Sequence, residues 1–292
     1  MWALAAAGVA WYVASVAKEV TYVTLADGRQ QERSIPLIYR VILPFVGNLS
    51  QFVSRPAFAS QVAAADEMLV SAGFEGLLSG AEFVSIKCIL PIVVAPAAAL
   101  FAIAMAALMP DMGSMFFMLA ALATAMAYVQ PVMWLRGSVK RRHLSIQKAL
   151  PFVLDILTLS VEAGMDFISA LQRNCKSRRL DPLNEELLRM TKEIQVGSSR
   201  REALKNMAER VKQPDLKSVA FALIQADELG VSIGSILRIQ SEQLRSVRFD
   251  RAERLAAQAP VKMLGPLMLC IFPAVFIILL GPILSQAMKG VI

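Results

Sequence analysis

The sequence predicts an all-α, polytopic membrane protein that carries a water-soluble helical bundle between two of its membrane segments. Hydrophobic residues make up 56% of the 292 residues and charged residues only 18%, whereas soluble domains are nearer to one quarter charged. The apolar excess is concentrated in three uncharged stretches, Cys88–Pro110, Met112–Leu135 and Met263–Met288. About 20 helical residues cross a hydrocarbon core ~30 Å thick, so each stretch is long enough to span it. We therefore expect a transmembrane hairpin at 88–135 and a last transmembrane helix at 263–288.

The first 17 residues form a shorter uncharged stretch. A signal peptide normally begins with basic residues, and none is present here, although Ser15-Val16-Ala17 has the small residues of a cleavage site. We favour a transmembrane anchor at 1–17 over a cleaved signal. The chain then has three to four transmembrane helices.

Residues 18–87 are expected to form a partial helical region at the cytoplasmic face of the membrane. Ile35–Val53 is apolar but contains Arg40 and two prolines, which favours an interfacial segment over a span. Phe58–Leu78 has the spacing of one or two short amphipathic helices.

The charges predict the orientation. The formal net charge is +7, and 136–262 holds 23 Lys and Arg against 15 Asp and Glu, whereas 18–87 holds 6 against 7. Basic residues flanking a span mark its cytoplasmic side, so both segments are expected in the cytoplasm and the turn at Asp111 outside. No basic patch interleaved with aromatic residues is present, so nucleic acid is not an expected partner. Protein partners and the membrane surface fit the charge better.

Residues 136–262 are predicted to form a six-helix bundle. The first helix carries Leu150, Leu154 and Leu157 on one face. Helix starts are indicated by Asp166, Asp181-Pro182, Ser199 with Glu202, Pro214 and Ser232. We expect Pro260 to interrupt the sixth helix. The predicted structural caps are thus Gly164, Gly197, Gly230 and Pro260.

Two groups of charged residues are candidates for partner binding. Glu162, Glu193 and Glu228 lie near the ends of predicted helices, where a carboxylate costs roughly 0.3–1 kcal/mol against the helix dipole. They are either solvated or paired with neighbouring arginines, or they contact another protein or a cation. Arg245, Arg248 and Arg251 form either a solvated face of the sixth helix or a contact with an acidic partner or anionic lipid.

The residues of catalytic and cofactor sites are missing. There is no P-loop string, and His143 is the sole histidine. Residues 230–234 spell GxSxG, but a helix is predicted before the serine and no histidine follows it. Cys88, Cys175 and Cys270 have no zinc spacing. We therefore expect no enzyme, no catalytic residue, no metal and no cofactor.

A small transporter or channel is the alternative to a protein-binding scaffold. The predicted spans hold prolines that can break helices around a substrate site. Against this, the spans have no internal charge and no internal repeat.

The segment 150–282 resembles the F domain of type II secretion and type IV pilus platform proteins. The matching strings are Leu159–Gly164, Gly197 with Glu202-Ala203-Leu204, Gln225–Gly230 and Ala259–Pro266 with Phe272-Pro273. The last of these is most similar to the Tad (Flp pilus) branch, in particular to TadC assembly proteins.

The resemblance implies a non-catalytic scaffold in the bacterial inner membrane, with its F domain in the cytoplasm. Such a protein forms homo- or hetero-oligomers with a sister platform protein, binds a hexameric secretion ATPase and helps lift pilin subunits from the lipid bilayer. Larger relatives carry two such bundles and this chain has one, which implies that a partner supplies the second.

Overall fold

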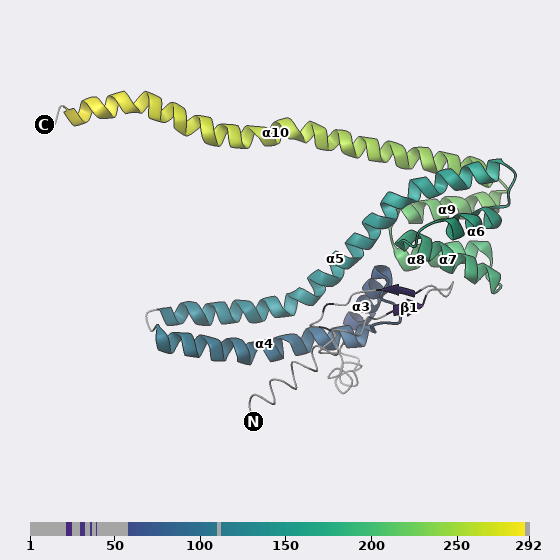
Figure 1. The fold of residues 1–292 in the computed structure, drawn as a ribbon, viewed down its shortest axis with the longest axis horizontal. Coiled ribbons are helices and arrows are strands. Elements are labelled where there is room, and N and C mark those ends of the chain that lie inside the picture. Colours follow the sequence, from purple (N-terminus) through teal and green to yellow (C-terminus); the bar gives the residue numbers. More distant parts are fainter. Residues whose placement is uncertain are drawn as a thin grey trace. The chain divides into compact units, whose positions relative to one another are not determined.

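The computed structural model describes residues 22–24, 30–32, 36, 39, 58–109 and 112–289, and these are mostly helical (Figure 1). Contacts divide the chain into two units, Met1–Arg238 and Ile239–Ile292. The helices are α3 (Ala59–Ala72), α4 (Gly80–Leu108), α5 (Gly113–Glu162), α6 (Phe167–Ser177), α7 (Pro182–Gln195), α8 (Arg200–Val211), α9 (Pro214–Leu229) and α10 (Ile233–Lys289).

One short hairpin departs from the helical pattern. β1 (Tyr22–Thr24) pairs antiparallel with β2 (Gln30–Glu32), with Val23 opposite Gln31. The sequence-based prediction placed only helices in 18–87 and missed this hairpin. The predicted anchor at 1–17 lies outside the described residues.

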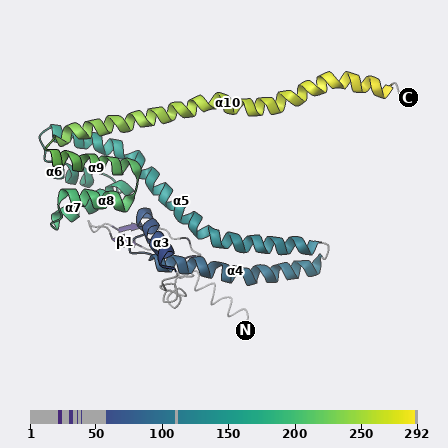
Figure 2. The ribbon, with the colours of Figure 1, turned by 180° about the vertical axis from the view of Figure 1, so that it is seen from behind.

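Three helices of the described chain are long and apolar enough to cross a membrane: α4, α5 and α10. The predicted all-α polytopic fold is therefore confirmed. Large apolar side chains such as Leu100 and Phe101 of α4 are about two-thirds exposed, as expected of side chains that contact lipid. Helices α4 and α5 lie side by side (Figures 1 and 2), and the Met112 N–H donates to the Met109 carbonyl at 3.2 Å in the turn between them.

Helix α5 continues over 50 residues from the transmembrane hairpin, which it forms with α4, into the helical bundle. The end of the uncharged stretch at Leu135 is thus a change of surroundings and not the end of a helix. Figure 1 shows α5 changing direction between its two halves. The pair Gly137-Ser138 follows the uncharged stretch, and the Ser138 hydroxyl donates to the Trp134 carbonyl at 3.0 Å. Glycine–serine pairs and serine bonds of this kind accompany helix bends.

Helix α3 packs over an apolar core where the α4–α5 hairpin begins and ends. We call this core the base core. Leu69 of α3 is buried with Phe74 and Leu78 of the following turn. The Trp134 ring of α5 packs on Phe74 with 5.3 Å between ring centroids. The other buried members include Phe83, Val84, Ile86 and Leu90 of α4 and Leu135 of α5.

The bundle consists of the second half of α5, α6 to α9 and the first turns of α10. Two of the predicted start signals act as side-chain caps: Asp166 accepts from the Ile168 N–H at 2.9 Å, and Asp181 accepts from the Asn184 N–H at 2.7 Å. Buried apolar residues come from all six helices, namely Leu150, Leu154, Leu171, Leu183, Met190, Leu204, Leu216, Leu223 and Leu237.

Helix α10 runs over 57 residues and contains Pro260 in its interior. The prediction that Pro260 interrupts and caps the sixth helix is wrong. A proline inside a helix lacks one amide proton, here the one that would bond to the Ala256 carbonyl, but the turns on either side can continue. Pro266, Pro273 and Pro282 are also internal to α10.

Candidate partner-binding surface and its ion pairs

Each of the three candidate glutamates is paired with an arginine on another helix. Glu162 lies 2.6 Å from Arg238, and Glu228 lies 3.0 Å from Arg201. Glu193 lies 2.9 Å from Arg210. Of the two interpretations of these residues, the geometry favours the arginine-paired one. The structure does not bring the three glutamates together on one partner.

The glycines after these glutamates terminate helices in the left-handed conformation. Gly164, Gly197 and Gly230 have φ values of 89°, 115° and 67°. At the end of α5 the Met165 N–H donates to the Ser160 carbonyl at 3.1 Å, and at the end of α9 the Val231 N–H donates to the Ala226 carbonyl at 3.0 Å. These bonds satisfy carbonyls that the helix leaves without partners.

The ends of α5 and α9 and the starts of α6 and α8 meet in one region, which we call the helix-end surface. Arg200 of α8 links them, since it lies 3.8 Å from Asp166 before α6 and 3.6 Å from Asp227 of α9. The exposed members of the surface include Leu159, Glu162, Asp166, Arg201, Asp227, Glu228 and Leu229.

The ion pairs on the helix-end surface are open to solvent. Arg201 and Glu228 have exposed side-chain fractions of 52% and 46%. Exposed pairs of this kind stabilise a protein by about 0–1 kcal/mol, so either partner can exchange its contact at little cost. Leu159 and Leu229 are 67% and 77% exposed next to these charges. A surface with large apolar side chains and weakly held charges is suited to binding another protein.

Glu193 belongs instead to a largely buried ion-pair network. At its centre Glu186 of α7 accepts from Arg142 of α5 at 2.7 Å and from Arg210 of α8 at 2.9 Å. Arg142 also donates to Glu185, and Arg210 to Glu193, both at 2.9 Å. The Glu186, Arg142 and Arg210 side chains are 10% exposed or less. The network therefore fixes α5, α7 and α8 to one another.

Sequence reasoning selected Glu193 and missed the rest of this network. Arg142 stands in the basic run after the membrane stretch, and Glu185 and Glu186 stand in and directly after the first turn of a helix, where acids are common. Both positions have an ordinary explanation in sequence. Only the fold brings residues 43 and 44 positions apart into contact.

Arg245, Arg248 and Arg251 lie on an exposed stretch of α10 in the second unit. The sole histidine has a structural contact, since His143 Nε2 lies 2.8 Å from the Val211 carbonyl oxygen.

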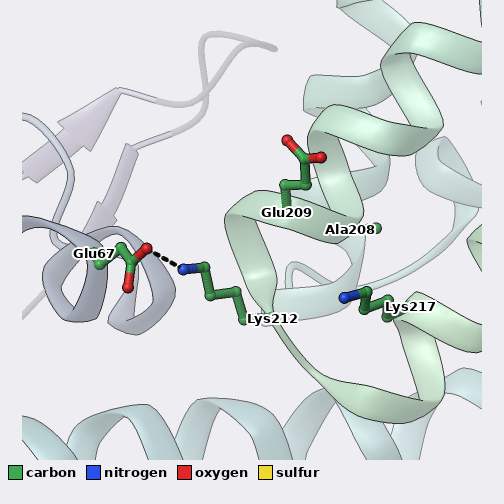
Figure 3. A pocket seen from close by; sticks show the side chains of 5 residues that line it. All are labelled: Glu67, Ala208, Glu209, Lys212 and Lys217. Atoms are coloured by element: carbon green, nitrogen blue, oxygen red, sulfur yellow. Dashed lines mark ion pairs between the residues drawn. The ribbon is translucent and has the colours of Figure 1, made fainter. Parts of the chain in front are cut away.

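A cavity of about 560 Å³ lies between α3 and the α8–α9 connection. Figure 3 shows its lining residues, with Glu67 of α3 paired with Lys212 across it. The remaining lining residues are Ala208, Glu209 and Lys217. Two lysines and two glutamates leave the lining without a net formal charge. In the part of the chain that the structure describes, no cluster of His, Cys, Asp or Glu could hold a metal ion.

Nearby, Glu75 and Arg189 form another pair between the α3–α4 connection and α7. The Arg189 guanidinium, which donates to this carboxylate, holds the pKa of Glu75 below its usual 4.5. The carboxylate in turn raises the pKa of Arg189.

Comparison with known proteins gives a family match for part of the chain. No curated protein and no solved structure matches the chain. Residues 153–281 match the family described as "Type II secretion system (T2SS), protein F". The match begins in the second half of α5, includes α6 to α9 and ends in α10. Residues 153–281 are thus similar to protein F of type II secretion systems.

Proposed function

We propose that this chain is an inner-membrane platform protein of a Tad (Flp) type IV pilus assembly or secretion machine. Its bundle couples a cytoplasmic hexameric secretion ATPase to the extraction of pilin subunits and their assembly into a fibre. The observation that carries the proposal is the similarity of 153–281 to protein F, in a segment joined through α5 and α10 to candidate membrane spans. Such a role requires movement and contact and no catalysis by this chain.

The charge distribution supports a cytoplasmic bundle. Arg136, Lys140 and Arg141 are exposed on α5 directly after the uncharged stretch. Basic residues next to a span are retained in the cytoplasm. The bundle and its helix-end surface then lie in the compartment where a secretion ATPase works.

Continuous helices support a mechanical role. Helix α5 joins the hairpin and the bundle over 50 residues, or ~75 Å at 1.5 Å per residue. The buried network at Glu186 holds its second half to α7 and α8. A displacement of α7 or α8 is therefore passed on to the second half of α5, which continues into the hairpin. A sister platform protein would supply the second bundle that larger relatives carry within one chain.

The proposal is tested by crosslinking in the native cells, affinity purification of the chain and mass spectrometry of what is recovered. We expect a second platform-like membrane protein and a secretion ATPase. Glu228→Arg should reduce recovery of the ATPase while helical content is unchanged, because it reverses a charge on the helix-end surface. The matched control is Glu209→Arg, which changes the similarly exposed pair with Lys205 elsewhere on α8.

Recovery of neither protein under crosslinking would contradict the proposal. Solute flux in proteoliposomes would then support the transporter or channel alternative. Loss of helical content in Glu228→Arg would contradict the assignment of Glu228 to a binding surface.

A further inference from the structure

The first unit contains two apolar cores with a polar joint between them. The last buried residue of the base core on α5 is Leu135, with the partly buried Val139 packed against it, and the bundle core on the same helix begins at Ile146. Between these residues α5 carries the exposed cations Arg136, Lys140 and Arg141. A joint crossed by a continuous apolar core is rigid, whereas two parts with separate cores can move relative to each other as rigid bodies.

Across this joint, α3 and the connection to α4 contact the bundle through polar groups. Arg189 of α7 donates through both terminal nitrogens to the Glu75 carboxylate, with one bond of 3.1 Å. Lys212 pairs with Glu67, and the Ser71 hydroxyl donates to the Arg210 carbonyl at 3.3 Å. We call the two ion pairs, Glu75–Arg189 and Glu67–Lys212, the latch.

The latch is weak enough to open. Its four side chains have exposed fractions of 42% to 66%, so water and salt compete with both pairs. Lys212 reaches Glu67 from a left-handed backbone with φ of 56°, an uncommon conformation for a residue other than glycine. The cavity beside Glu67 and Lys212 separates α3 from the end of α8, so these two helices are not closely packed there (Figure 3).

The joint also contains a point at which α5 can bend. Gly137 has no side chain, and the nearest atom to a built Cβ is Arg141 Nη1 at 3.8 Å. Ser138 donates to the Trp134 carbonyl at 3.0 Å. Both features weaken the resistance of a helix to bending.

From these observations we propose that the bundle moves as a body about Gly137-Ser138, and that the latch holds it against α3 in the conformation seen here. The proposal concerns the chain by itself and does not rest on the pilus or secretion assignment. Opening breaks two exposed ion pairs and one hydrogen bond, and it leaves the bundle core and the buried network at Glu186 intact.

Distances between spin labels in the full-length protein in detergent test this proposal. One label is placed on α3 (Ser60→Cys) and one at the end of α7 (Gln195→Cys), both at exposed positions, after the three native cysteines are replaced by alanine. We expect one dominant distance at low salt. Glu75→Arg, or Arg189→Glu, should increase the population at longer distances several-fold, and the double variant, which restores the pair with reversed charges, should return it to the starting level.

The matched control is Arg201→Glu, which breaks an ion pair of similar exposure on the helix-end surface and should leave the distances unchanged. Circular dichroism of each variant checks that the helices remain folded. Unchanged distances in both single variants would overturn the proposal. So would a double variant that does not recover, because the effect would then not come from this pair.

Discussion

Replacement of Glu186 by glutamine tests the buried network. Glu186 is 6% exposed and binds Arg142 at 2.7 Å and Arg210 at 2.9 Å. Removing one partner of a buried ion pair costs about 3–5 kcal/mol, because the remaining charge stays buried without compensation. Each arginine keeps a second carboxylate, Glu185 for Arg142 and Glu193 for Arg210. We therefore expect Glu186→Gln to lower the free energy of unfolding by about 3 kcal/mol, near the lower end of this range.

The assay is thermal unfolding of the detergent-solubilised chain followed by circular dichroism. One kcal/mol corresponds to about 2–4 °C in a domain of roughly 150–250 residues, so Glu186→Gln should lower the melting temperature by about 6–12 °C. Glu228→Gln, which removes one partner of an exposed pair, should cost at most about 1 kcal/mol. Equal shifts in the two variants would refute the reasoning, because a buried and an exposed carboxylate would then be equivalent.

Three further predictions concern single residues. Gly230→Ala should destabilise the bundle by about 1 kcal/mol through backbone strain alone, since φ is 67° and no atom lies within 4 Å of a built Cβ; an unchanged melting temperature would contradict the left-handed cap. Gly137→Ala should have the opposite sign, stabilising by about 0.5–1 kcal/mol as a helical glycine, and should also narrow the distance distribution between labels at 60 and 195. Arg189 lowers the pKa of Glu75, so ionised Glu75 stabilises the fold above pH 4.5, and this stabilisation is lost as the pH falls through the lowered pKa. Glu75→Gln should therefore make the melting temperature depend less on pH on the acid side. An unaltered pH dependence would contradict the Glu75–Arg189 pair.

Several helix starts in the bundle were predictable because local residues determine them. The Ser199 hydroxyl accepts from the Glu202 N–H at 3.2 Å, as its spacing indicated. Asp181 caps α7 with Pro182 in the first turn. Each signal acts within one turn of helix, so neither needs the rest of the fold.

Features that depend on distant residues were not predictable. The partners of Glu162 and Glu228 are 76 and 27 positions away in the chain, and several arginines competed for each glutamate. Helix continuity at Pro260 was misjudged because a proline removes one hydrogen bond of a helix while the turns on either side can continue. The hairpin at 22–32 was missed although Asp27-Gly28, a common turn pair, stands between its strands.

The order in which the bundle is assembled along the chain has a consequence for biosynthesis. Its buried residues extend from Ile146 to Leu237, and the last uncharged stretch begins only at Met263. Chains leave the ribosome from the N-terminus, and domains fold as units during synthesis. All side chains of the bundle core are therefore made before the final segment reaches the insertion machinery. The transmembrane hairpin and the bundle can therefore fold while the growing end is still attached to the ribosome, so that the last membrane helix is inserted after the bundle has folded.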